Sequence, residues 1–206
     1  MKDIVIFGTR GLGQIVRDYL HADHTRRVVA HTVERRFAAS PQFEGLPVYP
    51  FEELEAQCPP STHALLIAIG QMDRNRLRAR VFDDAVARGY EIETFVDAAV
   101  RRHASNRIGR GCLIFENVSL QPYADIGDNV VIRPLAYVGH HATIESHCFI
   151  APHAALLGEC RIGAYSFVAA QATVSSRVTI GPRSVIAAGA VVTHDVPANS
   201  IVRRTP

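Results

Sequence analysis

A six-residue repeat runs through the second half of this chain and constrains its fold more than any other feature. Every sixth residue from 108 to 192 is aliphatic, without exception: Ile108, Ile114, Leu120, Ile126, Ile132, Val138, Ile144, Ile150, Leu156, Ile162, Val168, Val174, Ile180, Ile186 and Val192. Four residues after each of them comes a small side chain, as at Cys112, Ala136 and Ala190. An α-helix repeats every 3.6 residues and a strand every two, so neither element accounts for a period of six.

A unit of six residues suits a short strand followed by a sharp turn. Three such units close a triangular coil, so the fifteen units predict five coils in which residues eighteen apart stack as parallel neighbours. The aliphatic side chains then fill the interior, and the small ones fit where the prism is narrow. The repeat therefore predicts a parallel β-helix.

The first half of the chain has a different pattern, in which apolar strands alternate with helices. We predict strands at 2–7, 28–33 and 65–69, and helices from the glycines to about 20, from 51 onward and over 73–89. Residues 91–96 lead towards the repeat. This alternation indicates a parallel sheet with helices on both faces. We therefore expect a Rossmann-like domain over residues 1–96 and a β-helix over residues 97–206.

A glycine-rich loop, Gly8-Thr9-Arg10-Gly11-Leu12-Gly13, joins the first strand to the first helix. Its spacing, G-x-x-G-x-G, differs from the G-x-G-x-x-G of dinucleotide-binding domains. A loop of this kind offers backbone N–H groups and the positive end of a helix dipole to a phosphate, although the same glycines also make simple tight turns. Because about ninety residues are too few for a full dinucleotide domain, the loop favours a mononucleotide or a nucleotide-sugar.

Composition argues against several classes of function. Lys and Arg total 22 and Asp and Glu total 20, a balance that does not favour nucleic acid or a membrane surface as partner. No stretch has the length of a membrane span or the pattern of a leader peptide, so we expect a cytoplasmic protein. Cys112, Cys148 and Cys160 fall on the small-residue position of the repeat, and we expect buried free thiols there rather than disulfides or zinc ligands.

The order of the segments carries a resemblance to a known family. The stretches IVIFGTRGLGQIVRDYL, FEGLPVYPFEELE and LLIAIGQMDRNRLR precede the hexapeptides. This order resembles that of the hexapeptide-repeat sugar acyltransferases of bacterial surface-glycan synthesis, which comprise nucleotide-amino-sugar N-acetyltransferases and sialic-acid O-acetyltransferases. The resemblance covers essentially the whole chain. It implies a left-handed β-helix, a homotrimer, a UDP-linked 4-amino sugar held by the first domain, and acetyl-CoA held between the β-helices of neighbouring subunits.

The resemblance also implies the residues of the nucleotide-sugar site. Four residues of the glycine loop would lie near phosphate, a later glycine would line the same pocket, and one acidic residue follows the second strand: Gly8, Arg10, Gly11, Gly13, Gly70 and Glu34. Relatives usually carry an acidic pair after the second strand. This chain has His31-Thr32-Val33-Glu34, in which only Glu34 is acidic.

Acylation of an amine by a thioester needs a base, a donor to the oxyanion and two aligned substrates. The resemblance assigns the base to His140 and the position that orients its ring to His141, where relatives carry Glu or Asp. It assigns contact with the thioester carbonyl to the N–H of Gly158, one coil away. Small residues occupy the positions along which the pantetheine arm runs: Ala170, Ala188 and Gly189. Judged by its position in the repeat alone, His140 is a solvent-facing turn residue, and Gly158 is a glycine that allows a tight turn at a corner.

Histidines also recur every six residues, at His141, His147 and His153, which raises the question of a metal site. Successive units of a triangular coil face different sides, so these side chains point in different directions within one subunit. We therefore expect no metal.

The sequence thus predicts an acyl-CoA-dependent N-acyltransferase that uses acetyl-CoA, acts on a nucleotide-linked amino sugar and serves bacterial surface-glycan synthesis. Two alternatives stay open: O-acetylation of a sugar such as sialic acid, and a non-catalytic trimeric scaffold of the same fold. The trimer is also expected because a prism flank that carries Phe149, Leu156 and Phe167 would need a partner.

Overall fold

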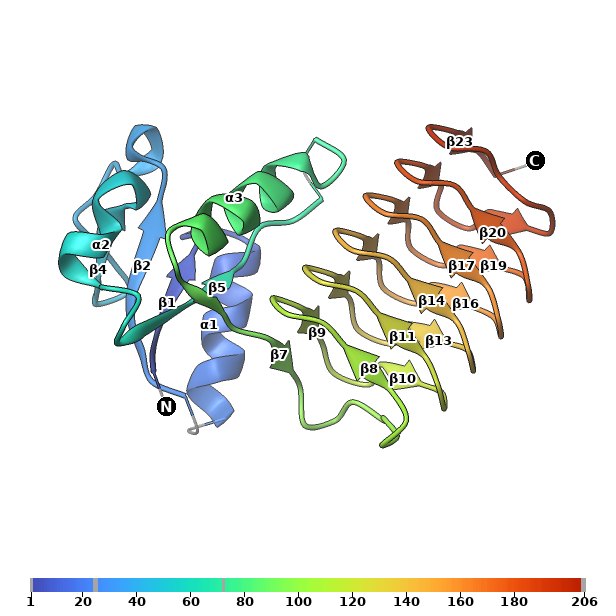
Figure 1. The fold of residues 1–206 in the computed structure, drawn as a ribbon, viewed down its shortest axis with the longest axis horizontal. Coiled ribbons are helices and arrows are strands. Elements are labelled where there is room, and N and C mark those ends of the chain that lie inside the picture. The colour runs from blue at the N-terminus through green and yellow to red at the C-terminus, as the bar shows by residue number, and fades with distance from the viewer. Residues whose placement is uncertain (1, 24–25, 72, 205–206) are drawn as a thin grey trace. The chain divides into compact units, whose positions relative to one another are not determined.

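The computed structural model describes residues 2–23, 26–71 and 73–204. The chain forms two compact units, an α/β sheet and a stack of coils (Figure 1). The first unit comprises Met1–Gly70 with Arg80–Glu93, and the second comprises Gln71–Ala79 with Thr94–Pro206.

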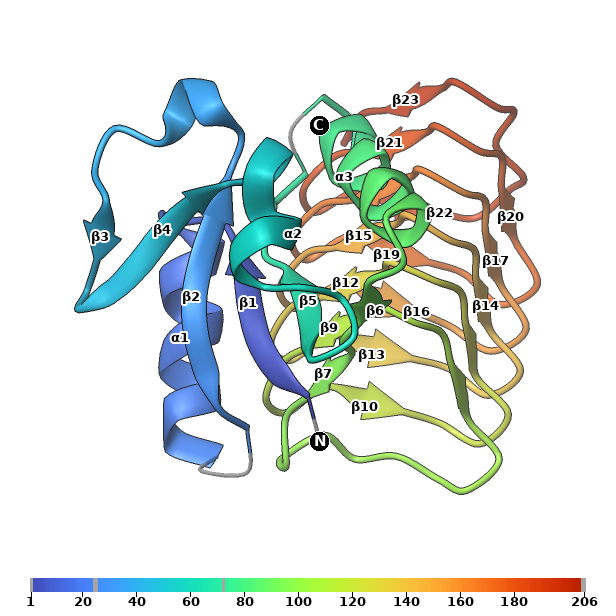
Figure 2. The ribbon, with the colours of Figure 1, turned by 60° about the vertical axis from the view of Figure 1, so that its left-hand side comes forward.

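The first unit is built on a sheet of strand order β3-β4-β2-β1-β5-β6 (Figure 2). Its strands are β1 (Asp3–Phe7), β2 (Val28–Val33), β3 (Gln42–Phe43), β4 (Leu46–Pro50), β5 (His63–Ile67) and β6 (Glu91–Ile92). Its helices are α1 (Leu12–Asp23), α2 (Leu54–Gln57) and most of α3 (Arg76–Ala87), with short 3₁₀ turns at Arg35–Phe37 and Phe51–Glu53. All paired strands are parallel except the hairpin β3–β4.

Strands β1 and β5 lie at the centre of this sheet, and their apolar residues are at most 5% exposed. Continuous apolar runs of this kind are typical of parallel strands covered on both faces. The predicted strands are confirmed as β1, β2 and β5, and the predicted helices as α1, the turn that begins at Phe51, and α3. Helix α3 begins three residues later than predicted, because Asp73, Arg74 and Asn75 have positive φ angles of 48°, 50° and 65°.

The hairpin β3–β4 was not predicted from the sequence. Glu44 and Gly45 both have positive φ, 48° and 79°, as a two-residue type I′ turn requires. Asn-Gly and Asp-Gly are the usual signals for this turn, and Glu-Gly is a weaker one. Strand β4 was not predicted either. It ends at Pro50 and pairs in parallel with β2, and a proline usually argues against a place inside a sheet.

The second unit is a β-helix of two-residue strands (Figure 1). The fifteen strands of the repeat are β8 (Arg107–Ile108), β9 (Leu113–Ile114), β10 (Ser119–Leu120), β11 (Asp125–Ile126), β12 (Val131–Ile132), β13 (Tyr137–Val138), β14 (Thr143–Ile144), β15 (Phe149–Ile150), β16 (Ala155–Leu156), β17 (Arg161–Ile162), β18 (Phe167–Val168), β19 (Thr173–Val174), β20 (Thr179–Ile180), β21 (Val185–Ile186) and β22 (Val191–Val192). Each strand ends on one of the predicted aliphatic residues, and paired strands are eighteen residues apart, as for Ile126 and Ile144. The predicted fold, an α/β domain followed by a β-helix, is confirmed.

The strands stack into three parallel sheets. Sheet 1 contains β8, β11, β14, β17 and β20, and sheet 3 contains β10, β13, β16, β19 and β22. Sheet 2 contains β9, β12, β15, β18 and β21, and is extended at its two ends by β7 (Phe95–Val96) and β23 (Ile201–Val202). The first residue of each strand faces outward, since the second fills the interior. Sheet 1 therefore presents charged and hydroxyl side chains, sheet 2 presents apolar ones, and sheet 3 presents uncharged ones.

The prediction of an exposed apolar flank formed by Phe149, Leu156 and Phe167 is wrong for two of the three residues. Leu156 is fully buried in the interior rather than on a flank, and Phe149, on sheet 2, is only 7% exposed within the single chain. Of the three residues, only Phe167 stays half-buried. The exposed large apolar side chains of sheet 3 are instead Tyr137 and Val191, at 37% and 66%.

The three cysteines of the repeat are free and lie in the core of the β-helix, as predicted. Burial raises the pKa of Cys112 to about 11 and the pKa values of Cys148 and Cys160 to about 12. Thiols with such pKa values are not ionised near neutral pH, so they act as small apolar side chains.

The turns of the β-helix share one backbone conformation. The third residue after each aliphatic one has positive φ from Gly111 to Gly189, and glycine occupies this position only at those two ends. His141, His147 and His153 all stand here, with φ of 57°, 63° and 59°. Their six-residue recurrence therefore reflects a turn position. Within residues 2–23, 26–71 and 73–204, no three His, Cys, Asp or Glu side chains gather as metal ligands would.

The first turn of α3 is anchored in the β-helix unit, which the sequence did not indicate. Arg78 is 1% exposed and donates hydrogen bonds to the carbonyl oxygens of Gly111 (2.7 Å) and Asn129 (3.5 Å). Burial lowers the pKa of its guanidinium to about 10, so it stays charged at neutral pH. Asn75 is also buried, and its side-chain amide donates to the carbonyl oxygen of Ser166 (3.2 Å).

Replacing Arg78 with leucine is expected to destabilise the protein by about 3 kcal/mol. The change leaves buried carbonyl oxygens without their donor, and each such loss costs about 1–3 kcal/mol. Chemical unfolding followed by circular dichroism measures the effect. The control is Arg76→Ala, on the same turn but exposed, which should change stability by less than about 0.5 kcal/mol. Equal unfolding midpoints for the two variants would contradict the anchoring role.

Candidate active site

His140 lies at the corner of the prism where sheet 3 passes into sheet 1, on the turn between β13 and β14. The turns of successive coils touch here. A Cβ atom added to Gly139 would lie 2.5 Å from the backbone nitrogen of Gly158. The N–H of Glu159 donates to the carbonyl oxygen of His140 (2.8 Å), which ties the two coils together beside the imidazole.

The ring of His140 lies directly over Gly158. A Cβ atom at Gly158 would be 2.5 Å from Nε2 and 2.7 Å from Cε1 of His140, closer than any side chain could approach. Glycine at 158 therefore provides the space that the ring occupies. Since His140 itself is exposed, its ring is held against the coil on one side and is open to solvent.

His141 lies beside His140 with its ring nearly perpendicular, at an interplanar angle of 82°. The two Nδ1 atoms are 3.2 Å apart. A hydrogen bond between two imidazole nitrogens needs one proton, so one ring donates and the other accepts. His141 also stacks on Tyr123, with ring centroids 4.7 Å apart and an interplanar angle of 22°.

The three residues expected along the pantetheine arm lie at a different corner. Ala170, Ala188 and Gly189 stand where sheet 2 passes into sheet 3, and the N–H of Gly189 donates to the carbonyl oxygen of Ala170 (2.9 Å). Ala188 is exposed. The structure thus brings His140, His141 and Gly158 together, and the width of sheet 3 separates them from these small residues.

The glycine loop of the first unit lies at the carboxyl end of β1. Gly8 has a φ of 127°, and a Cβ atom at Gly13 would lie 2.6 Å from the carbonyl oxygen of Gly8, so the turn requires both glycines. Arg10 and Gly11 are exposed. Gly70 follows β5, the neighbour of β1 on its other side, and among the described residues other than its own chain neighbours no heavy atom lies within 4 Å of a Cβ placed on it.

Strand β1 lies between β2 and β5: the chain passes from β1 to β2 on one side of it and later returns to β5 on the other side. Ligands of open parallel sheets bind at the carboxyl ends of the strands, where the chain direction reverses in this way. In this unit the glycine loop follows β1 and Gly70 follows β5, so both lie at the carboxyl ends of these two strands.

Glu34 lies at the end of β2 but is already paired. Its side chain is 14% exposed and contacts Arg36 (2.8 Å) and Arg80 (2.5 Å). Burial would raise the pKa of Glu34, but hydrogen bonds and charge from Arg80 and Arg36 outweigh it and lower the pKa. In this structure the carboxylate is occupied by these two arginines.

His31 is a buried residue of this site that the sequence analysis did not single out. It is fully buried, and its Nδ1 lies 2.8 Å from the carbonyl oxygen of Gly8. Burial lowers the pKa of His31 despite that hydrogen bond, which favours the neutral ring. The last four residues of β2 are all buried, so its place in this strand could have indicated a buried His31, but only the structure shows that His31 supports the glycine loop.

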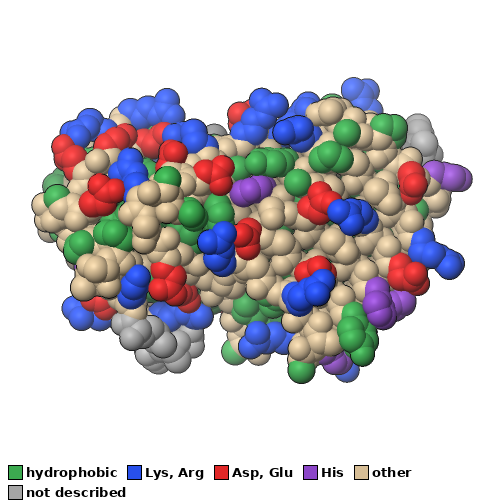
Figure 3. Space-filling view, viewed as in Figure 1, with side chains coloured by type: hydrophobic (Ala, Val, Ile, Leu, Met, Phe, Trp, Pro, Cys, Tyr) green, Lys and Arg blue, Asp and Glu red, His purple; other side chains and the backbone are tan. Residues whose placement is uncertain are grey.

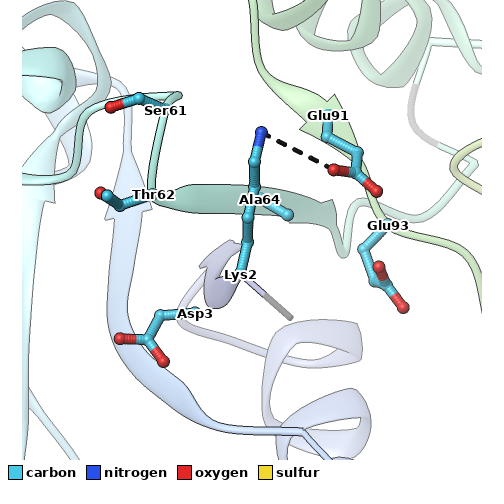
Figure 4. Close-up of a pocket in the computed structure, with 7 residues that line it drawn as sticks. All are labelled: Lys2, Asp3, Ser61, Thr62, Ala64, Glu91 and Glu93. Carbon is cyan, nitrogen blue, oxygen red and sulfur yellow. Dashed lines mark ion pairs between the residues drawn. The ribbon is translucent and has the colours of Figure 1, made fainter.

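A hollow of about 550 Å³ opens on the same sheet near the amino ends of its strands, opposite the glycine loop (Figure 4). It is lined by Lys2, Asp3, Ser61, Thr62, Ala64, Glu91 and Glu93. These residues lie at the amino ends of β1 and β5 and along β6, and an ion pair between Lys2 and Glu91 (3.7 Å) crosses it. The hollow contains none of the predicted site residues.

Charges are mixed over the surface. Figure 3 shows Lys and Arg side chains interspersed with Asp and Glu on the face drawn. An ion pair joins Arg107 to Asp125 on sheet 1 (2.6 Å), and another joins Arg161 of the same sheet to Glu145, which follows β14. In the part of the chain that the structure describes, no helix has the length and apolar character needed to cross a bilayer.

Comparisons with known proteins agree with this architecture. Residues 114–203 match the family model of the GMPPB C-terminal domain. The bifunctional protein GlmU of Agrobacterium fabrum is 49% identical over 43 residues, which are 21% of this chain and only 10% of GlmU.

Similarity to solved structures covers both units. A histidine-to-asparagine variant of perosamine N-acetyltransferase from Caulobacter crescentus, in complex with CoA and GDP-perosamine, is 27% identical, with a TM-score of 0.87 over 98% of this chain and 93% of that one. The acetyltransferase domain of PglB from Neisseria gonorrhoeae has a TM-score of 0.87 at 24% identity, over 98% and 96% of the two chains. WeeI from Acinetobacter baumannii has a TM-score of 0.84 at 21% identity, over 98% and 97%.

Proposed function

We propose that this chain, a hexapeptide-repeat sugar acetyltransferase by its full-length structural similarity, transfers the acetyl group of acetyl-CoA to the amine of a nucleotide-linked amino sugar. The observation that carries the proposal is the His140 ring held over Gly158 at a prism corner, in a chain that shares both units with perosamine N-acetyltransferase.

The reaction needs no covalent intermediate on the protein. The neutral amine attacks the thioester carbonyl, a C–N bond forms, and the C–S bond to CoA breaks. His140 accepts the amine proton at Nε2 and returns it to the departing sulfur, so the products are an amide and free CoA. Imidazole suits both steps because its usual pKa lies near neutral pH.

The backbone N–H of Gly158 would stabilise the oxyanion. At the corner between sheets 1 and 2, backbone N–H groups at the same position of the repeat donate to side chains: that of Arg110 to Asp128 (2.8 Å) and that of Asp128 to Ser146 (3.1 Å). This turn position therefore directs its N–H out of the prism. At Gly158 the same direction would present the N–H to a carbonyl oxygen held beside His140.

His141 supports an amine rather than a hydroxyl as the acceptor. A neutral imidazole can accept the Nδ1–H of His140 but adds no negative charge, so it raises the basicity of His140 less than a carboxylate would. An amine is already nucleophilic in its neutral form, whereas a hydroxyl depends more strongly on the base. The pair of histidines therefore favours N-acetylation.

The placement of the cofactor residues supports a homotrimer. His140 and Gly158 lie at one edge of sheet 3, and Ala170, Ala188 and Gly189 lie at the other. One acetyl-CoA can use both sets if one corner comes from each of two neighbouring copies. A closed ring in which every copy offers both corners makes all the sites equivalent, and three triangular prisms satisfy this with threefold symmetry.

The first unit would hold the nucleotide-sugar. The glycine loop and Gly70 offer backbone groups to a diphosphate at the carboxyl ends of β1 and β5, and His31 supports that loop from below through Gly8. Glu34 would reach a ribose or base only by leaving Arg36 or Arg80.

Thiol release from acetyl-CoA tests the function. The assay uses the purified protein and a panel of UDP- and GDP-linked amino sugars, including GDP-perosamine, with sialic acid as a hydroxyl acceptor. We expect release that depends on an amino sugar and is absent with the matching sugar that lacks the amine. Release only with sialic acid would favour O-acetylation, and no release with any acceptor would favour a non-catalytic scaffold.

Replacing Ala188 with tryptophan should raise the KM for acetyl-CoA by at least about tenfold, because an indole ring would fill the proposed path of the pantetheine arm. The KM for the amino sugar should stay within about twofold. The control is Thr179→Trp, on strand β20 and facing outward from sheet 1. Sedimentation should show that both variants keep the assembly of the unmodified protein. An unchanged KM for acetyl-CoA in Ala188→Trp would place the groove elsewhere.

A further inference from the structure

The hydrogen bond between the two histidines couples their tautomers: if Nδ1 of His140 donates, its Nε2 is free, and if Nδ1 of His140 accepts, its Nε2 carries the proton. The Nδ1 atoms are 3.2 Å apart, and Nε2 of His140 faces Gly158. For Nε2 to act as the base of the proposed reaction, the proton of the neutral ring must be on Nδ1. His141 must then present an unprotonated Nδ1 as acceptor and carry its own proton on Nε2. His141 can hold His140 in this tautomer only while its ring keeps Nδ1 within hydrogen-bond distance of Nδ1 of His140.

Tyr123 is the side chain that holds this ring. It stands eighteen residues before His141, at the same turn position one coil earlier, and the two residues have similar φ angles of 64° and 57°. Their rings stack at 4.7 Å with an interplanar angle of 22°. The N–H of His141 donates to the carbonyl oxygen of Pro122 (3.2 Å), and the N–H of Tyr123 donates to Oγ of Ser105 (3.1 Å). The backbone ladder thus sets the spacing at which the rings stack.

We propose that Tyr123 is a positioning residue for His140. It acts through His141, by keeping the second imidazole in the orientation that accepts the Nδ1–H of His140. The proposal rests on the proposed function for its kinetic effect, but its structural content is the tautomer of His140, which exists without substrate. Stacking replaces the negative charge that a carboxylate would use to orient the ring.

The chain contains a matched control for the stack itself. His147 and Tyr165 stack in nearly the same geometry, at 4.7 Å and 26°, at the corner between sheets 1 and 2. There, Nδ1 of His147 lies 2.9 Å from the side-chain nitrogen of Asn129. Removing Tyr165 therefore deletes a similar ring contact without touching the corner of His140.

The tautomers can be read directly from the ¹⁵N ring signals of histidine-labelled protein in a long-range ¹H–¹⁵N correlation spectrum. Signals of His140 and His141 are assigned by their loss in His140→Gln and His141→Gln. In the unmodified protein, we expect His140 protonated on Nδ1 and His141 protonated on Nε2. Tyr123→Phe keeps an aromatic ring and should preserve both patterns. Tyr123→Ala should give averaged tautomer signals for both rings, and Tyr165→Ala should leave them unchanged.

The kinetic arm uses the same proteins. Tyr123→Ala should lower kcat about 2- to 10-fold, the range that corresponds to losing one aromatic contact, while both KM values change less than about twofold. In a His141→Ala background the same substitution should have no further effect. A fixed His140 tautomer in Tyr123→Ala, or the same averaging in Tyr165→Ala, would overturn the proposal. So would a raised sugar KM with unchanged ring signals, since Tyr123 would then contact the substrate. The spectra need no acceptor, so they test the positioning role of Tyr123 even if the protein acetylates no sugar.

Discussion

Replacing His140 with alanine is expected to lower kcat by about 10²–10⁴-fold, the usual contribution of a positioned proton acceptor. The ring lies over Gly158 at an open corner, where an amine and a thioester can meet. The KM for acetyl-CoA should change little, because the imidazole acts on the transition state more than on the bound donor. Steady-state kinetics with a confirmed acceptor measures both quantities.

Two comparisons sharpen the His140 prediction. His141→Ala should cost less than His140→Ala, since it removes the orienting partner and leaves the base. The double variant should then resemble His140→Ala alone, because two residues that act as a unit are not additive. A kcat for His140→Ala within about threefold of the unmodified protein would remove this residue from the mechanism.

Replacing Gly158 with alanine is expected to lower kcat by about 10- to 100-fold while the protein stays folded. The new methyl group would stand 2.5 Å from Nε2 of His140, so the ring has to rotate away. A catalytic group misplaced by about 1 Å can cost about 10²-fold. The stability cost should be small, because the clash is with the end of an exposed side chain, which can rotate, and not with backbone.

Gly139→Ala provides the contrast. Its methyl group would meet the backbone nitrogen of Gly158 at 2.5 Å and the carbonyl carbon of Leu157 at 2.6 Å, neither of which can move alone. We therefore expect Gly139→Ala to lower the unfolding midpoint clearly, and Gly158→Ala to lower kcat with little change in that midpoint. If Gly158→Ala kept full activity, the observed placement of the His140 ring would not be the working one.

The β-helix could be predicted strand by strand because its repeat is strict. All fifteen aliphatic residues end a strand, and the sheet register follows from the eighteen-residue spacing alone. The first unit was less predictable where local signals were weak, as at the Glu44-Gly45 turn and at Pro50. The anchoring of Arg78 in the β-helix unit had no signal at all, since an arginine on an arginine-rich helix is ordinarily solvent-exposed.

In the candidate site too, the features set by the repeat could be predicted and the other side-chain contacts could not. The repeat placed Gly158 next to His140, because their separation is one coil. It could not show that Glu34 is held by Arg36 and Arg80, or that His31 supports the glycine loop, since these residues lie outside the repeat and no periodic pattern predicts their side-chain contacts. The stack of His141 on Tyr123 follows the repeat spacing, but two aromatic rings at that spacing gain meaning only once their orientation is known.

The most direct test of the account is the chemical structure of the product. The protein is incubated with acetyl-CoA and the amino-sugar nucleotide that gives the fastest thiol release, and the purified product is examined by mass spectrometry and by ¹H–¹⁵N correlation on a ¹⁵N-labelled amine. We expect one added acetyl group, an amide N–H signal in place of the amine, and loss of this product with His140→Ala. An acetyl ester on a hydroxyl, or amide formation at an undiminished rate in His140→Ala, would contradict it.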